Sequence, residues 1–111
     1  MAKFVIKGTG NFNHVLNELD KSIKNSISAS LEDSSSGRLG DTRFETRVYE
    51  RYSWLGGNRL SLTLTLIGSG DQLNLSLITA GGSQAMFFKI NRFGENSFLN
   101  SVVPTAKTLI K

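Results

Sequence analysis

Residues able to do chemistry are scarce in this chain of 111 residues. It has a single histidine, His14, and no cysteine, which excludes disulfides, thiolate metal sites and cysteine nucleophiles. A catalytic histidine needs a nucleophile and an orienting group within hydrogen-bond reach, and nothing at helical spacing from His14 supplies them. A zinc site would need several histidine, cysteine or carboxylate ligands. The sequence therefore predicts a protein that is not an enzyme and that uses no metal or cofactor.

Paired carboxylates are the remaining route to catalysis, because such pairs form in space rather than along the chain. Glu32 and Asp33 precede a serine-rich segment, and Glu45 and Glu50 share a predicted strand. Most such residues are surface charges or members of weak ion pairs. Glu50 would be an exception if it were buried, because its charge would then need a partner or a raised pKa.

Glycine-rich segments offer a second kind of chemistry. The segment Gly81-Gly82-Ser83-Gln84 could form a nest of backbone N–H groups for an anion, but it lacks the lysine and the spacing of a P-loop. A turn that lets the chain leave a sheet is the more common use of such a segment. The formal net charge of +4 allows an anionic partner without requiring one.

Two helices are expected. The first follows Asn11, a good N-cap residue, and its apolar stripe recurs at i, i+3, i+4, i+7 and i+11: Phe12, Val15, Leu16, Leu19 and Ile23. The second begins at about residue 95, and its apolar face comprises Phe98, Leu99, Val102, Val103, Ala106, Leu109 and Ile110. Pro104 lies inside this second helix and should kink or break it.

Alternation of apolar and polar residues predicts five strands, at residues 3–8, 26–32, 42–52, 60–66 and 73–77. Residues 33–41 are rich in serine and glycine and are expected to form a flexible loop. Residues 54–58 read as a turn, 68–71 as a hairpin connection, 79–84 as a break, and 85–90 as a buried connector.

The order β-α-β-β-β-β-α predicts a single α+β domain over residues 1–111. Strands joined by short turns favour an antiparallel five-stranded sheet, and one apolar stripe per helix favours two helices packed on one face. This order is similar to the TATA-binding-protein-like arrangement, which helix-grip domains elaborate. The similarity is one of topology, and such folds carry unrelated functions.

The strand at 42–52 leaves two binding hypotheses open. With Phe44, Val48 and Tyr52 assigned to the apolar face, the open face would present a basic stripe of Arg43, Arg47, Tyr49 and Arg51. We expect a binding or interaction role, either with a protein partner, a second copy included, or with a small apolar ligand. That ligand would lie between sheet and helices, against Glu50, Tyr52, Trp54, Phe88 and Phe98. Single-stranded nucleic acid on the basic stripe is the alternative.

Three segments carry a family resemblance: SASLED at 28–33, YSWLGGNR at 52–59 and GGSQAMFFKI at 81–90. Together they resemble a small uncharacterised bacterial family, a domain of unknown function found mostly in Gram-positive organisms, over nearly the whole chain. The resemblance implies a stand-alone cytoplasmic domain and carries no known activity. Cytoplasmic localisation is also expected because the N-terminal apolar run is too short for a signal peptide and no stretch is long enough for a membrane span.

Overall fold

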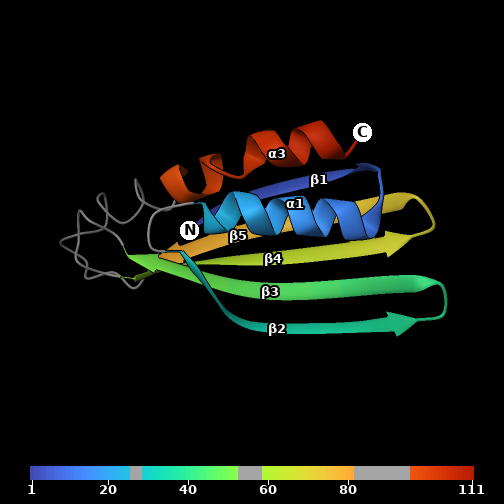
Figure 1. Ribbon diagram of the computed structural model, residues 1–111, viewed down its shortest axis with the longest axis horizontal. Coiled ribbons are helices and arrows are strands. Elements are labelled where there is room, and N and C mark those ends of the chain that lie inside the picture. Colours follow the sequence, from blue (N-terminus) through green and yellow to red (C-terminus); the bar gives the residue numbers. More distant parts are fainter. Residues whose placement is uncertain (26–28, 53–58, 82–95) are drawn as a thin grey trace.

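A computed structural model describes residues 1–25, 29–52, 59–81 and 96–111 (Figure 1). Its elements are β1 (Ala2–Thr9), α1 (Phe12–Lys24), β2 (Ser30–Leu39), β3 (Thr42–Tyr52), β4 (Arg59–Ser69), β5 (Gln72–Gly81) and α3 (Val103–Leu109). This order confirms the predicted β-α-β-β-β-β-α class. The predicted turn at 54–58 and the connector at 85–90 lie outside the described residues, and so do Trp54 and Phe88.

The five strands form one sheet in the order β1-β5-β4-β3-β2, and every neighbouring pair is antiparallel. The β2–β3 and β4–β5 hairpins each turn through a Gly-Asp pair, at residues 40–41 and 70–71. Gly40 and Gly70 have φ values of 58° and 61°, a left-handed conformation that glycine adopts without steric cost. The predicted hairpin at 68–71 is thereby confirmed. Likeness to TATA-binding-protein-like folds stays a prediction.

Both helices lie on one side of the sheet (Figure 1). Helix α1 packs on β4, α3 packs on β1, and the two helices pack against each other. The leucines that alternate along β4 and β5 point to this side and are buried: Leu60, Leu62, Leu64, Leu66, Leu73, Leu75 and Leu77. Each buried leucine contributes roughly 1.5–3 kcal/mol, so this layer dominates the stability of the fold.

The N-cap prediction for α1 is confirmed, because the Asn11 side chain accepts a hydrogen bond from the His14 backbone N–H at 2.9 Å. Pro104 also behaves as predicted. Residues 96–100 are helical, residues 101–102 form a turn, and α3 starts again with Pro104 in its first turn. Proline is tolerated there because N–H groups in the first turn have no partner within the helix. No helix in the described parts of the chain is long and apolar enough to cross a membrane.

The prediction of a flexible loop at 33–41 is wrong. Residues 33–39 continue β2, which pairs with β3 as far as Leu39 opposite Thr42, with a bulge between Leu31 and Asp33, and only residues 40–41 form a turn. Almost all of β2 is exposed, and Figure 1 shows β2 and β3 extending beyond the helices. A strand with no covered face has no apolar alternation, so its sequence resembles a loop. Strand β5 likewise runs on to Gly81, inside the predicted break at 79–84, whose residues 82–84 lie outside the described part of the chain.

Candidate functional site

The register between β3 and β4 decides what each sheet face carries. Tyr49 lies opposite Leu62, and Arg47 lies opposite Leu64. Directly opposite residues of antiparallel strands point to the same side, and these leucines are buried beneath the helices. The side chains predicted for the open face therefore lie on the helix side, and that prediction is wrong: Arg43, Arg47, Tyr49 and Arg51.

The predicted ligand cavity fails for the same reason. Glu50 and Tyr52 point away from the helices, whereas Phe98 is fully buried on the helix side. These three residues cannot line one cavity because the sheet lies between them. Glu50 is also no buried charge, since its side chain is 33% exposed and its carboxylate accepts a hydrogen bond from Arg59 at 2.9 Å.

A polar network ties β3 to α1 on the helix side. The Tyr49 hydroxyl donates to Asp20 Oδ1 at 2.6 Å, and Arg47 Nη1 donates to the same oxygen at 3.2 Å. Arg47 Nε also donates to Glu45 Oε2 at 2.8 Å. In this half-buried network, each donor is bonded to a carboxylate of the same network. We call these four residues, Asp20, Glu45, Arg47 and Tyr49, the Asp20 network; it acts as a clamp because it joins helix α1 to strand β3.

The pKa shifts agree with a structural role. Burial alone would raise the pKa of Asp20, but hydrogen bonds from Tyr49 and Lys24, together with nearby positive charges, hold it below its ordinary value. Burial, followed by the hydrogen bond to Asp20, raises the pKa of Tyr49. At neutral pH Tyr49 therefore remains a proton donor and Asp20 a charged acceptor.

The other two arginines of β3 cover the rim of the core. The Arg43 guanidinium lies 4.1 Å from the centroid of the Phe12 ring, and that of Arg51 lies 4.4 Å from the Phe98 ring. Long cationic side chains can cover apolar surface while their charged ends reach water, and stacking on a ring adds a favourable cation–π contact. The arginines thus belong to the packing of the fold, and no basic stripe runs along the open face of β3.

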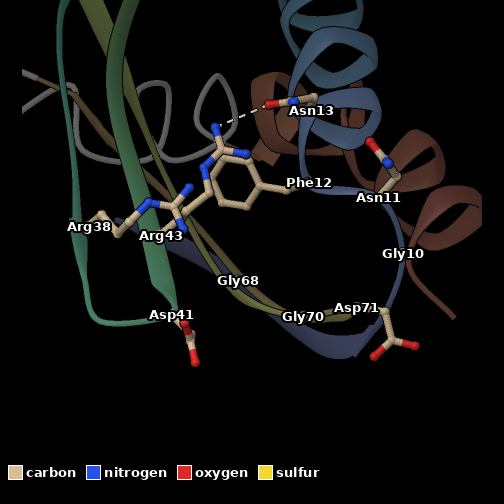
Figure 2. Close-up of a pocket in the computed structure, with 10 residues that line it drawn as sticks. All are labelled: Gly10, Asn11, Phe12, Asn13, Arg38, Asp41, Arg43, Gly68, Gly70 and Asp71. Carbon is tan, nitrogen blue, oxygen red and sulfur yellow. Dashed lines mark hydrogen bonds between the residues drawn. The ribbon is translucent and has the colours of Figure 1, made fainter.

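A solvent-open hollow of about 550 Å³ lies at the start of α1, between the two Gly-Asp turns (Figure 2). Arg38 and Arg43 reach into it from opposite strands, and Arg43 donates to Asn13 Oδ1 at 3.1 Å. Asp41 and Asp71 stand at its rim, and Figure 2 shows both directed away from the guanidinium groups. Two positive and two negative side chains balance, so this hollow does not select strongly for an anion.

Among the residues that the structure describes, no cluster of three or more histidine and acidic side chains could hold a metal ion. His14 lies exposed on α1, away from the Asp20 network. Glu45, the acidic residue that interrupts the arginines of β3, is ion-paired with Arg47. Among the described residues, hydroxyls do contact carboxylates, as Tyr49 contacts Asp20 and Ser30 contacts Glu32, but His14 is part of neither contact.

We call the side of the sheet that faces away from the helices the uncovered face. It carries exposed apolar side chains and hydroxyls, and the sequence did not predict these apolar residues there. Its large exposed apolar residues are Val5, Leu39, Phe44, Tyr52 and Ile67. Two of the hydroxyls between them, those of Thr46 and Thr65, are joined by a 3.0 Å hydrogen bond, and Ser61 donates to the backbone carbonyl of Ala80.

Charge is asymmetric on the uncovered face. At one edge, β1 presents Lys3 and Lys7; at the opposite edge, β2 presents Asp33. Toward one end, the Glu50–Arg59 pair largely neutralises itself. The face is therefore positive along one edge, apolar and hydroxylated in the middle, and negative at the other edge.

Comparison with known proteins gives a family but no activity. Residues 1–110 match the model of a protein family described as a family of unknown function (DUF6054). The match confirms the resemblance to a domain-of-unknown-function family, while its Gram-positive origin stays a prediction. A search of the curated proteins found no match.

Proposed function

The chain belongs to DUF6054, a family of unknown function, and we propose that it is a non-catalytic interaction domain that binds a protein through its uncovered sheet face. One observation carries the proposal. Apart from Met1 and Leu31, the large apolar side chains exposed in the described residues all lie on that face, and Phe44 and Ile67 are direct neighbours there. An exposed apolar surface rimmed by polar residues is typical of a protein-binding site.

One apolar pair near the hairpin-turn end of the face suits protein contact. Ile67 and Phe44 lie opposite each other on β4 and β3, with exposed fractions of 41% and 36%. The Phe44 ring also lies over Gly37 of the edge strand, where a Cβ would collide with it. Covering such apolar surface gains about 25 cal/mol per Å², and the paired hydroxyls cost little to desolvate because they keep their hydrogen bonds.

The same observations favour protein over the alternatives. A small apolar ligand would need space between sheet and helices, but the described core there is filled by leucines, Tyr49 and Phe98. Single-stranded nucleic acid would need accessible arginines on the open face, and Arg43, Arg47 and Arg51 are engaged on the other side. A protein surface is the occupant that fits a flat apolar face with hydroxyls.

Site-specific photo-crosslinking tests the proposal. A photoreactive phenylalanine analogue replaces Phe44, or in the control Leu31, and each variant is irradiated in its host cells. The two positions match in exposure, at 36% and 37%, but Leu31 lies on the helix side opposite Tyr49. We expect a protein adduct from position 44 and none from position 31. Absence of an adduct at position 44, or equal adducts at both positions, would contradict the proposal.

A further inference from the structure

We infer that the partner on the uncovered face is a second copy of this chain, related to the first by a two-fold axis parallel to the strands. The inference rests on the proposed function and names the occupant of the same surface. Three features of the face carry it: its charge asymmetry, a hollow beside Ile67 that the exposed Phe44 ring of a second copy could fill, and its area.

The register defines one complete row across the uncovered face. Its residues lie directly opposite one another from β1 to β2: Lys3, Ile78, Thr63, Val48 and Asp33. Strand β4 is central in the sheet. A two-fold axis that runs along β4, in the plane of contact, lays β1 of each copy over β2 of the other. Lys3 of one copy then faces Asp33 of the second, and the contact occurs twice.

The charges of the face disfavour the other two-fold axis in the plane of contact, which is perpendicular to the strands. An axis perpendicular to the strands would lay β1 over β1, which places Lys3 of each copy against Lys7 of the other. Juxtaposed like charges disfavour an interface, whereas complementary edges favour one register. Only the axis parallel to the strands converts the charge asymmetry of the face into attraction.

Shape selects the same axis. A hollow of about 550 Å³ opens on the uncovered face beside Ile67, and its lining includes Lys7, Gln72 and Asn74. Asn74, Ile67 and Phe44 share a row, with Ile67 in the middle. Rotation about β4 carries Phe44 of the second copy over Asn74, and its ring, which lies over Gly37, comes over Lys7 within this hollow. Each ring then fills the hollow of the other copy, while the two Ile67 side chains meet at the axis.

The area matches a reversible dimer. Five strands about 4.8 Å apart, over about seven residues at 3.4 Å each, give a face of about 600 Å² per copy. Two copies would bury about 1,200 Å², the lower limit for specific protein interfaces. Face-to-face packing of two sheets is a common arrangement, with a spacing of about 10 Å. We therefore expect a dimer that dissociates in the micromolar range.

Sedimentation velocity over a concentration series tests the pairing. We expect Ile67→Lys to be monomeric where the unmodified chain is dimeric, and Leu31→Lys, on the helix side, to remain dimeric. Lys3→Asp and Asp33→Lys should each weaken pairing about tenfold, since the symmetry disturbs two contacts at once. The double variant should recover it. Circular dichroism establishes that each variant is folded.

Crosslinking of introduced thiols tests the axis, and the absence of native cysteine makes each thiol unique. With a short bis-maleimide, Ile67→Cys should crosslink to itself. The perpendicular axis would instead place Ile67 opposite Thr63 of the second copy, so only mixed Ile67→Cys and Thr63→Cys samples would crosslink.

The outcomes separate the two proposals. A photo-adduct at position 44 with twice the mass of the chain supports the second copy. An adduct of any other mass leaves the proposed function standing and overturns this inference. An unmodified chain that stays monomeric at every concentration also overturns it, and a dimer with the Thr63–Ile67 crosslinking pattern overturns the axis.

Discussion

The two sides of β3 reverse the usual distribution of charged and apolar residues. On the helix side the strand presents arginines, Glu45 and Tyr49, and on the uncovered side it presents Phe44, Thr46 and Val48. The covered charges are tolerated because each is stacked on a ring or paired, as Arg47 is with Asp20 and Glu45. The exposed apolar residues are less covered: the Arg59 guanidinium lies 5.8 Å from the centroid of the Tyr52 ring, and the Phe44 ring lies over Gly37, but no described helix packs on either. On the helix side of β3, charged groups and core residues therefore satisfy one another, whereas no element in the described parts of the chain packs over the other side.

Truncation of the two aromatic residues should show the largest contrast between these sides. Tyr49→Ala removes a fully buried ring and the hydroxyl bonded to Asp20, so we expect a loss of about 3–5 kcal/mol in the free energy of unfolding. Phe44→Ala removes a ring that water already reaches, and should cost the monomer about 1 kcal/mol or less. Urea denaturation of dilute protein measures both. Equal losses would mean that β3 is packed on both sides.

Removal of one arginine from each side of the sheet should lower the free energy of unfolding by different amounts. Arg47→Gln leaves Glu45 half-buried without its cation and leaves Asp20 with Lys24 as its remaining ion-pair partner, and should cost about 1.5–3 kcal/mol. Arg59→Gln breaks the more exposed pair with Glu50, and should cost less than about 1 kcal/mol. The same denaturation experiment checks them. Comparable losses would contradict the clamp assigned to the Asp20 network.

Two glycines offer a matched pair. A Cβ at Gly68 would come within 2.7 Å of the buried Phe12 ring, which α1 and Arg43 hold in place. A Cβ at Gly37 would also collide with a ring, that of Phe44, but this ring can swing into solvent. We expect Gly68→Ala to cost about 1–3 kcal/mol and Gly37→Ala distinctly less. A larger loss at Gly37 would indicate that Phe44 is held as firmly as Phe12.

The smallest of these expected effects is a loss of stability in acid, where Asp20 of the helix-side clamp becomes protonated. The pKa of Asp20 is lower in the folded chain than in the unfolded one, so its stabilising contribution is complete above about pH 4. It is lost as the pH falls through the lower, folded value. Asp20→Asn should therefore show a shallower fall in stability between about pH 4 and pH 2 than the unmodified chain. Unfolding curves at several pH values test this, and identical slopes would contradict it.

Sequence could predict what depends on local pattern. The stripe from Phe12 to Ile23 and the leucines of β4 repeat at the periods of helix and strand, so both elements and their buried sides were predictable. The side of β3 that faces the helices was not. Alternation shows that Arg47 and Val48 point oppositely, but only the pairing of Tyr49 with Leu62 shows which of them is covered.

The binding surface was missed for the same reason. With β3 turned over, its arginines were assigned to the open face and Phe44 to the core. The Gly40-Asp41 pair is typical of a hairpin turn and indicates the β2–β3 hairpin. The serines before it are exposed and show no apolar alternation, so the segment resembles a loop. Register between distant strands and the extent of helix cover are properties of the whole fold, and no single segment encodes them.

The bulge between Leu31 and Asp33 has a consequence for how far assembly can go. A sheet grows by adding strands to its margins, and an irregular, serine-rich β2 at one margin and lysine-bearing β1 at the other are poor templates for addition. Each copy has one flat uncovered face, and contact with a second copy covers it. Higher concentration should therefore raise the fraction of pairs without producing chains or fibrils.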